Sequence, residues 1–117
     1  MDKGLHSAFK ELLEDISNQK CIDCGKCNKG MVNPQWASVN NGIFLCLNCS
    51  GIHRSLGVEV SIIKSIVMDN FTESEITKMK IGGNKNFNEF IEFYKLTNEA
   101  QHIKYFSKAC DYYRRRV

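Results

Sequence analysis

The sequence predicts an α+β fold, with a short three-stranded antiparallel sheet at a four-cysteine site and about five helices around it. Three observations predict it. Two Cys-x-x-Cys pairs lie in the first half of the chain, an Asn-Gly turn between them separates two short apolar segments, and helical periodicity dominates the second half. With 117 residues, of which 43% are hydrophobic and 25% charged, the chain can bury one core but not two. We therefore expect a single domain over residues 1–117.

The first half of the chain combines one helix with a hairpin. Apolar residues at i, i+3 and i+4 predict a helix over about residues 3–17. Residues 36–39 and 43–45 flank Asn40-Asn41-Gly42, and an Asn-Gly step supplies the positive φ angles that a tight hairpin needs. Two short antiparallel strands are expected there.

A short helix and a third strand follow the hairpin. Residues 47–56 are predicted to form a helix that Gly57 ends with a left-handed C-cap. The apolar residues between Val58 and Met68 predict the third strand.

The remaining chain, about residues 72–114, is predicted to be helical. Thr72 and Glu75 have the spacing of a capping box, and the glycine pair at 82–83 ends the helix that they open. Asn84 is expected to cap the next helix, which carries Phe87, Phe90, Ile91 and Tyr94 on one face. A final helix is expected over about residues 99–114.

Several protein classes are excluded by composition. No apolar run approaches the ~20 residues of a membrane span, and the first 20 residues carry acidic side chains where a secretory signal has an apolar core. The six cysteines are therefore expected to be reduced in the cytoplasm, which favours metal binding or catalysis over a disulfide framework.

The cysteine spacing predicts a structural zinc site over about residues 21–49. Cys21 and Cys24 form one pair, and Cys46 and Cys49 form another after 21 intervening residues. Four thiolates can surround one Zn²⁺ as a tetrahedron at about 2.3 Å. A closed set of four cysteines leaves no position for water, so the ion is expected to be structural and not catalytic.

A second ligand set remains open. Cys24-Gly25-Lys26-Cys27 is also a Cys-x-x-Cys sequence. We favour Cys21 and Cys24, because Gly25 directly after the second cysteine helps the turn to present backbone N–H groups to sulfur. Cys27 is then a free loop thiol, and Cys110, on the stripe of the last helix, is expected in the core.

Arg54 stands apart on the helix after the second cysteine pair. At 100° per residue, Cys49, Ile52, His53 and Leu56 share one side of that helix. Arg54 lies on the opposite side and is expected to face outward, which on its own describes an ordinary solvated arginine. His53 is expected to be a hydrogen-bonded packing residue. Four thiolates and one Zn²⁺ would reduce the formal charge from +3 to +1, a weak basis for binding nucleic acid.

These residues resemble a known family. The central string runs Cys21-x-Asp23-Cys24-Gly25, then Pro34-x-Trp36-Ala37-Ser38-x-Asn40-x-Gly42-x-Phe44-Leu45-Cys46-x-x-Cys49-Ser50-Gly51-x-His53-Arg54-x-Leu56-Gly57. It resembles the catalytic domain of the Arf GTPase-activating proteins, the ArfGAP family, and the likeness extends over nearly the whole chain. A bare four-cysteine pattern is common to many zinc modules, whereas this string of intervening residues is specific.

The resemblance implies a GTPase activator that works in trans. Family members bind a GTP-loaded Arf-type small GTPase and insert an arginine finger, which matches Arg54 here. The chain lacks a G-x-x-x-x-G-K-[ST] motif, so GTP and Mg²⁺ are expected only on the partner and the chain is not expected to be an enzyme by itself. The family acts in vesicle trafficking, so we expect peripheral association with Golgi or vesicle membranes. The sequence does not indicate an oligomeric state, and a monomer is the default expectation.

The family match suggests further site residues with open roles. Trp36 is expected either to brace Arg54, to touch the GTPase, or simply to pack on the hairpin. Asp69 is expected to orient Arg54, to contact the partner, or to be an ordinary turn aspartate. Lys64 is a candidate for the interface. The chain departs from the family in an apparent insertion at residues 26–31.

Two other functions are weighed against the activator. One is a zinc module that binds DNA, which the low basic charge disfavours. The other is an Arf-binding scaffold without activity, which the presence of Arg54 disfavours.

Overall fold

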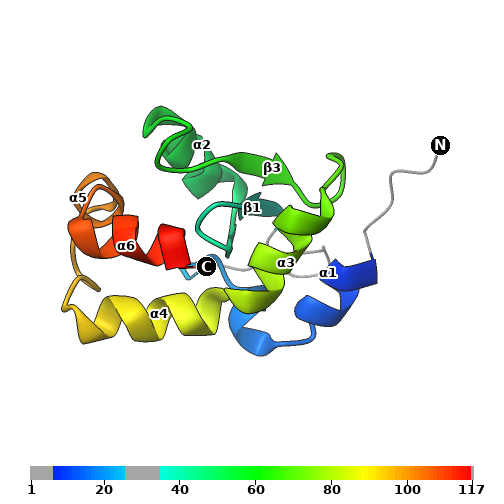
Figure 1. Ribbon diagram of the computed structural model, residues 1–117, viewed down its shortest axis with the longest axis horizontal. Coiled ribbons are helices and arrows are strands. Elements are labelled where there is room, and N and C mark those ends of the chain that lie inside the picture. Colours follow the sequence, from blue (N-terminus) through cyan, green and yellow to red (C-terminus); the bar gives the residue numbers. More distant parts are fainter. Residues whose placement is uncertain (1–6, 26–34, 117) are drawn as a thin grey trace.

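The computed structural model describes residues 7–25 and 35–116, and in that part of the chain it contains six α-helices, a 3-10 helix and three short strands (Figure 1). In chain order the elements are α1 (Ser7–Leu12), η1 (Ile16–Gln19), β1 (Trp36–Ser38), β2 (Ile43–Leu45), α2 (Leu47–Ser55), β3 (Ile63–Ser65), α3 (Glu73–Ile81), α4 (Asn84–Phe93), α5 (Gln101–Tyr105) and α6 (Lys108–Arg116). The predicted α+β class is confirmed. Among the described residues, no helix is both long and apolar enough to cross a membrane.

The sheet has β1 at its centre, paired antiparallel with β2 on one side and β3 on the other. Trp36 lies opposite Leu45 in one pairing and Ser65 in the other. In the β1–β2 connection, the Gly42 N–H donates to the Ser38 carbonyl at 2.8 Å, and Gly42 has a φ of 67°. The predicted hairpin, with its left-handed glycine, is therefore confirmed.

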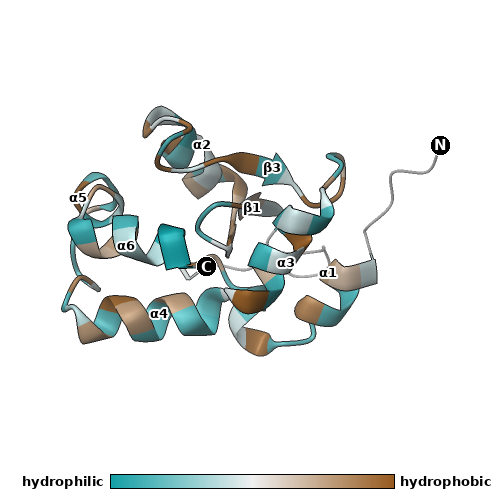
Figure 2. Ribbon diagram, viewed as in Figure 1, coloured by the Kyte–Doolittle hydropathy of each residue, from teal (hydrophilic) through white to brown (hydrophobic). Residues whose placement is uncertain are grey.

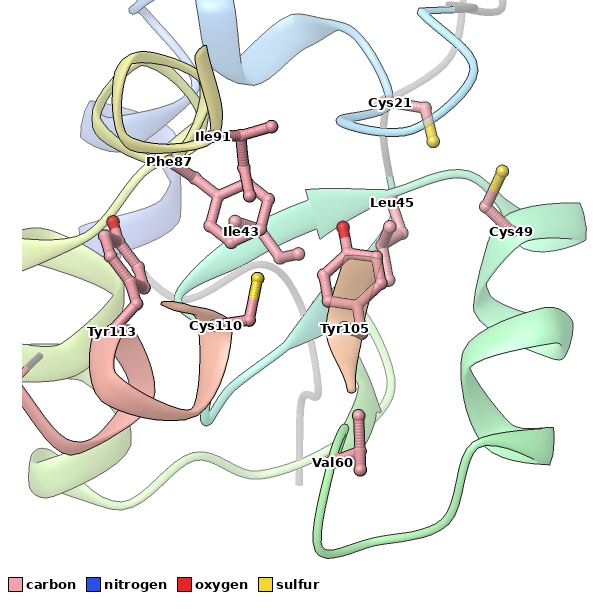
Figure 3. Close-up of a cluster of buried hydrophobic side chains, with 10 residues drawn as sticks. All are labelled: Cys21, Ile43, Leu45, Cys49, Val60, Phe87, Ile91, Tyr105, Cys110 and Tyr113. Atoms are coloured by element: carbon pink, nitrogen blue, oxygen red, sulfur yellow. The ribbon is translucent and has the colours of Figure 1, made fainter. Parts of the chain in front are cut away.

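The sheet is buried on both faces, by two different hydrophobic clusters. Ile43 and Leu45 belong to one cluster and Phe44, between them, to the other, as the alternation of side chains along a strand requires. The cysteine-side cluster (Figure 3) contains Cys21, Ile43, Leu45, Cys49, Val60, Phe87, Ile91, Tyr105, Cys110 and Tyr113. The α1-side cluster contains Ala8, Phe9, Ala37, Val39, Phe44, Ile66, Ile76 and Met79.

Different helices pack against the two clusters. In Figure 1, α1 and α3 lie at one end of the molecule and α4, α5 and α6 at the other. Hydrophobic and hydrophilic residues alternate along α4 (Figure 2), and its buried Phe87 and Ile91 join the cysteine-side cluster. Cys110 is also fully buried there, as predicted.

The first helix is shorter than the predicted range of 3–17, whose first residues lie outside the described part of the chain. α1 ends at Leu12, and η1 follows after a turn. The Asp15 carboxylate accepts from the Ser17 N–H at 2.9 Å and opens η1. The Asn18 side chain donates to the Leu12 carbonyl at 2.8 Å, which satisfies the end of α1. The apolar periodicity continues beyond Leu12 and would extend the helix, but hydrogen bonds from the Asp15 and Asn18 side chains to nearby backbone groups end it there.

The predicted strand over residues 58–68 is also too long. β3 covers only three residues, and the Gly57 carbonyl accepts from the N–H groups of Val60 and Ser61, which makes the first part of the range a turn. Gly57 has a φ of 96°, so its predicted left-handed conformation after α2 is confirmed.

The final helix, predicted over 99–114, is two helices. The Ser107 hydroxyl donates to the Lys104 carbonyl at 2.6 Å and accepts from the Cys110 N–H at 3.1 Å. One serine therefore ends α5 and begins α6. By contrast, the capping box of Thr72 and Glu75 at the start of α3 is confirmed.

Asn84 does not cap α4, as was predicted, but is its first residue. The cap is Gly83, with a φ of 93°, and the Asn84 N–H bonds to the side chain of Asn18 at 2.9 Å. The Asn84 side chain is fully buried, accepts from the Phe44 N–H at 2.8 Å and donates to the Lys20 carbonyl at 2.8 Å. It fastens α4 to β2 and to the segment that leads to the first cysteine pair.

Candidate functional site

Four cysteine sulfurs converge beside β2 and α2. The ligand atoms of Cys21, Cys24, Cys46 and Cys49 all lie within 4.8 Å of one another. The Sγ atoms of Cys24 and Cys46 are 3.7 Å apart, close to the edge of about 3.8 Å expected for a tetrahedron of sulfurs at about 2.3 Å from zinc. The favoured ligand set is therefore brought together, whereas Cys27 of the alternative set lies outside the described residues.

Backbone geometry holds each pair in place. Cys46 is the N-cap of α2, so Cys49 lies in the first turn and its N–H donates to the Cys46 sulfur at 3.4 Å. In the other pair, the Gly25 N–H donates to the Cys21 carbonyl at 2.9 Å with Gly25 at a φ of 73°. The Ile22 N–H donates to the Phe44 carbonyl at 3.0 Å and fastens this loop to β2.

The donor set fits a structural zinc ion. Burial raises the pKa of the Cys21 thiol to about 11 and also raises that of Cys49, so both are neutral thiols at pH 7 when no cation is bound. A Zn²⁺ would stabilise the thiolates and displace the protons. Four cysteines complete its coordination, so its contribution would be to hold the loop and the start of α2 together.

A buried carboxylate links this loop to α2 and α5. The Asp23 side chain is 1% exposed and lies between the two cysteines of the first pair. Its Oδ2 atom accepts from His53 Nε2 at 2.7 Å and from Gln101 Nε2 at 2.9 Å, and its Oδ1 atom accepts from the Tyr105 hydroxyl at 2.6 Å. The Lys104 ammonium is 3.8 Å away. The Asp23 carboxylate therefore joins the first cysteine pair, α2 and α5, which are far apart in the sequence.

The role of Asp23 was missed from the sequence, although His53 was correctly predicted to be a hydrogen-bonded packing residue. The available signal was an acidic residue inside a Cys-x-x-Cys turn, a position where a carboxylate lies close to the metal ligands. Its partners on α5 are 78 and 82 residues away, and no local pattern indicates them.

Arg54 projects from α2 into solvent, as predicted. Its guanidinium carbon lies 5.3 Å from the centre of the Trp36 ring, a cation–π contact. Within residues 7–25 and 35–116 the guanidinium makes no hydrogen bond or ion pair, so its donors are free in the described part of the chain. Trp36 is half-buried at the start of β1 and supports Arg54 from the sheet.

The surface around Arg54 is more apolar than predicted. Ile52 was placed on the inner side of α2, but its side chain is 46% exposed, since Cys49 and His53 occupy the buried side. Val58, in the turn after the helix, is 74% exposed. Apolar side chains thus flank Arg54 in the sequence on both sides.

Lys64 and Asp69 are engaged within the chain. The Lys64 ammonium forms an ion pair with Glu75 at 2.8 Å and donates to the Asn70 carbonyl at 2.9 Å. The Asp69 carboxylate accepts from the Ser65 N–H at 2.7 Å, which makes it a turn residue at the end of β3. Among the described residues, neither side chain forms a hydrogen bond or an ion pair with Arg54.

Comparisons with known proteins agree on one family. The ArfGap family model, described as "Putative GTPase activating protein for Arf", matches residues 6–116. The ADP-ribosylation factor GTPase-activating protein 3 of Mus musculus is 39% identical over 110 residues, which is 93% of this chain and 20% of that protein. The GCS1 ADP-ribosylation factor GTPase-activating protein of Saccharomyces cerevisiae is 38% identical over 118 residues, which is 100% of this chain and 32% of that protein. The chain thus spans between a fifth and a third of these relatives' length.

Solved structures show the same fold. A crystal structure from Cryptosporidium parvum, described as "putative GTPase activating protein for ADP ribosylation factor", superposes with a TM-score of 0.76 at 28% identity and covers 98% of this chain and 94% of that one. The ArfGap domain of HIV-1 Rev binding protein gives a TM-score of 0.64 at 23% identity, covering 90% of this chain and 76% of that one.

Proposed function

The chain belongs to the ArfGap family, and from this premise we propose that it accelerates GTP hydrolysis by an Arf-type small GTPase, with Arg54 as an arginine finger. The proposed partner is the GTP-bound form, because only that form presents a γ-phosphate. We also propose that residues 1–117 make up one ArfGAP domain and that it acts as a monomer at the surface of Golgi or vesicle membranes.

The single observation that carries the proposal is that Arg54 is exposed, supported by Trp36 and free of hydrogen-bond partners in the described part of the chain. An ordinary surface arginine can lie on a mobile segment, whereas Arg54 lies on a helix that begins with two cysteines of the four-sulfur site. Trp36 supports the guanidinium while its N–H donors remain free in the described part of the chain. A side chain held in this way loses little conformational entropy when it enters a partner's active site.

The chemistry of GTP hydrolysis suits this residue. Charge accumulates on the oxygens of the transferring phosphoryl group, and a planar guanidinium can donate two parallel hydrogen bonds to them. A lysine keeps the charge but not the fork, so the two residues are not equivalent at such a site. The nucleotide, the Mg²⁺ and the residue that orients water would all be supplied by the GTPase.

The experiment is single-turnover GTP hydrolysis by a GTP-loaded Arf, with the wild-type chain and with Arg54→Lys. We expect strong acceleration by the wild type and a loss of about 10³-fold or more in the variant, since an arginine finger contributes about 10³–10⁵ in rate. Zinc content and thermal stability should be unchanged, because the Arg54 side chain is exposed.

A matched control is Arg115→Lys, on α6, where the side chain is 78% exposed. It should accelerate hydrolysis as well as the wild type. Acceleration that persists in Arg54→Lys would assign the finger to another arginine. Tight binding of GTP-loaded Arf without any acceleration would show an inactive scaffold.

A further inference from the structure

We propose that Asp23 is a positioning residue for Arg54, and that it acts through His53 at the end of a buried hydrogen-bond chain that begins at Arg114. The inference rests on the proposed function, because the position of a finger is measured through the hydrolysis that it accelerates. It assigns a role to a carboxylate that is neither a cysteine ligand nor part of the exposed face.

The hydrogen bonds lead from α6 through the β1–β2 connection and the end of β1 to α2. Arg114, on α6, donates to Asn41 Oδ1 at 3.2 Å, and Asn41 Nδ2 donates to the Ser38 hydroxyl at 2.8 Å. The hydroxyls of Ser38 and Ser61 are 2.6 Å apart, and the Ser61 hydroxyl is 2.7 Å from His53 Nδ1. The four side chains between the two ends belong to buried residues.

The donors and acceptors along this chain can be assigned. A carboxylate oxygen only accepts, so His53 Nε2 carries the hydrogen that bonds to Asp23. In the tautomer with its hydrogen on Nε2, Nδ1 accepts from the Ser61 hydroxyl, and Ser61 in turn accepts from Ser38. Each hydroxyl then donates once in the direction of Asp23, with a cation at one end of the chain and an anion at the other.

This arrangement prevents α2 from turning about its axis. His53 has no exposed surface and is held at both ring nitrogens, while its ring lies edge-on to Tyr105 at 4.3 Å. Arg54 is the next residue of the helix, so its direction follows from that of His53. The cysteines hold only the first turn of α2, whereas His53 lies in the last turn, next to the finger.

Asp23 also connects α5 to the end of α2 that carries Arg54. Tyr105 and Gln101, both on α5, donate to its two oxygens. Figure 3 shows Tyr105 together with Phe87 and Leu45 in the cysteine-side cluster. Buried polar networks of this kind give directional order, and the loss of one partner leaves the rest of the network incompletely satisfied.

The substitution that disturbs the structure least is Tyr105→Phe. It removes the hydroxyl that donates to Asp23 but keeps the ring that stacks on Phe87 at 5.6 Å. The matched control is Tyr113→Phe, in the same cluster, whose ring contacts Phe87 at 5.3 Å and whose hydroxyl makes no hydrogen bond to Asp23. Both changes delete one oxygen from a buried tyrosine.

The readout is single-turnover hydrolysis by GTP-loaded Arf over a range of chain concentrations, which separates the maximal rate from the half-saturating concentration. We expect Tyr105→Phe to lower the maximal rate about tenfold with an unchanged half-saturating concentration, because small displacements of a catalytic group cost rate more than binding. Tyr113→Phe should match the wild type. Zinc content, measured on the same samples, should be one ion per chain throughout.

Two further variants test the route through His53. His53→Gln keeps an N–H near the position of Nε2 and should retain more of the maximal rate than His53→Phe, which keeps a ring but cannot donate to Asp23. Asp23→Asn is the most direct change, with an expected loss of about 100-fold in maximal rate. Where Asp23→Asn loses zinc or fails to fold, Tyr105→Phe still decides the question.

The possible results are distinct. A raised half-saturating concentration with an unchanged maximal rate, or weaker binding of GTP-loaded Arf when Tyr105→Phe is added to Arg54→Lys, would overturn the positioning role and indicate a general loss of structure. A wild-type maximal rate in Tyr105→Phe would also overturn it. A wild-type chain that gives no acceleration would overturn the proposed function, and this inference with it.

Discussion

The two faces of the sheet are stabilised by different chemistry. On the α1 side, Phe9 packs edge-on against Phe44 and Phe71, at 6.1 and 4.8 Å, within a cluster of apolar residues. On the cysteine side, thiols lie in the cluster itself, and the Asp23–His53 pair adjoins it. Apolar burial is non-directional, whereas thiolate–metal bonds and hydrogen bonds fix orientation. The comparison separates two kinds of stabilisation, which are apolar packing on the α1 side and directional hydrogen bonds around Asp23 and His53 on the cysteine side.

The largest expected effect comes from removing the metal site. Cys46→Ala deletes one sulfur and also the N-cap of α2. We expect loss of bound zinc and of cooperative unfolding, since zinc binding contributes on the order of 10–16 kcal/mol in zinc-finger peptides. Zinc content per chain and thermal melting followed by circular dichroism measure this, and an unchanged melting temperature would contradict it.

Two other cysteines provide controls for that experiment. Cys110→Ala removes a buried sulfur outside the four-cysteine group and should keep one zinc per chain, with a loss of only about 1 kcal/mol. Cys27→Ser, at a position outside the described residues, should also keep the ion. Metal loss in Cys27→Ser would support the alternative ligand set.

A smaller effect is expected on the α1 side. Phe9→Ala should lower the free energy of unfolding by about 3–5 kcal/mol, because Phe9 has no exposed surface and the change leaves a cavity. Zinc content should not change. Urea denaturation measures the effect as a shift of midpoint, and Phe93→Ala, at a side chain that is 77% exposed, is the control with an expected change within about 0.5 kcal/mol. Loss of zinc in Phe9→Ala would show that the two faces are not independent.

The smallest effect concerns pH. Partial burial opposes the ionisation of Glu75, but hydrogen bonds from Lys64 and Thr72 outweigh it and lower its pKa below the ordinary 4.5. A lowered pKa in the folded state stabilises the fold above pH 4.5, and this contribution is lost as the pH falls below that value through the folded pKa. Glu75→Gln should therefore cost about 1 kcal/mol at pH 7 and less at pH 4.

The control for this prediction is Glu73→Gln, in the same turn of α3 but exposed and with no ion pair in the described part of the chain. Its stability relative to the wild type should vary less between the two pH values. An equal dependence in both variants would show that the Lys64 and Thr72 contacts are not responsible.

Local patterns in the sequence predicted the features that depend on a few neighbouring residues. The hairpin follows from an Asn-Gly step, the capping box of α3 from Thr72 and Glu75, and the outward direction of Arg54 from helical periodicity. The four cysteines converge because each pair is itself a local turn. The family resemblance added the proposed role of Arg54, which periodicity alone did not indicate.

The missed features depend on contacts between distant residues. The serine that divides the last helix and the asparagine that ends α1 both act through side-chain bonds to backbone, which compete with apolar periodicity. Helical periodicity predicts Ile52 on the buried side of α2, but periodicity does not show how wide the buried side is, and Ile52 lies beyond its edge. Asp23 reaches its partners only when α5 folds back onto the first cysteine pair, so its role could be found only in three dimensions.

The contact between Arg54 and Trp36 has a practical consequence for spectroscopy. Trp36 is the single tryptophan of the chain, and the guanidinium lies over its indole ring. The emission of that ring depends on the charge and polarity next to it, so the chain carries its own optical reporter of where the arginine stands. Excitation that is selective for indole observes Trp36 alone among the aromatic residues, so we expect its emission to change when Arg54 leaves the ring.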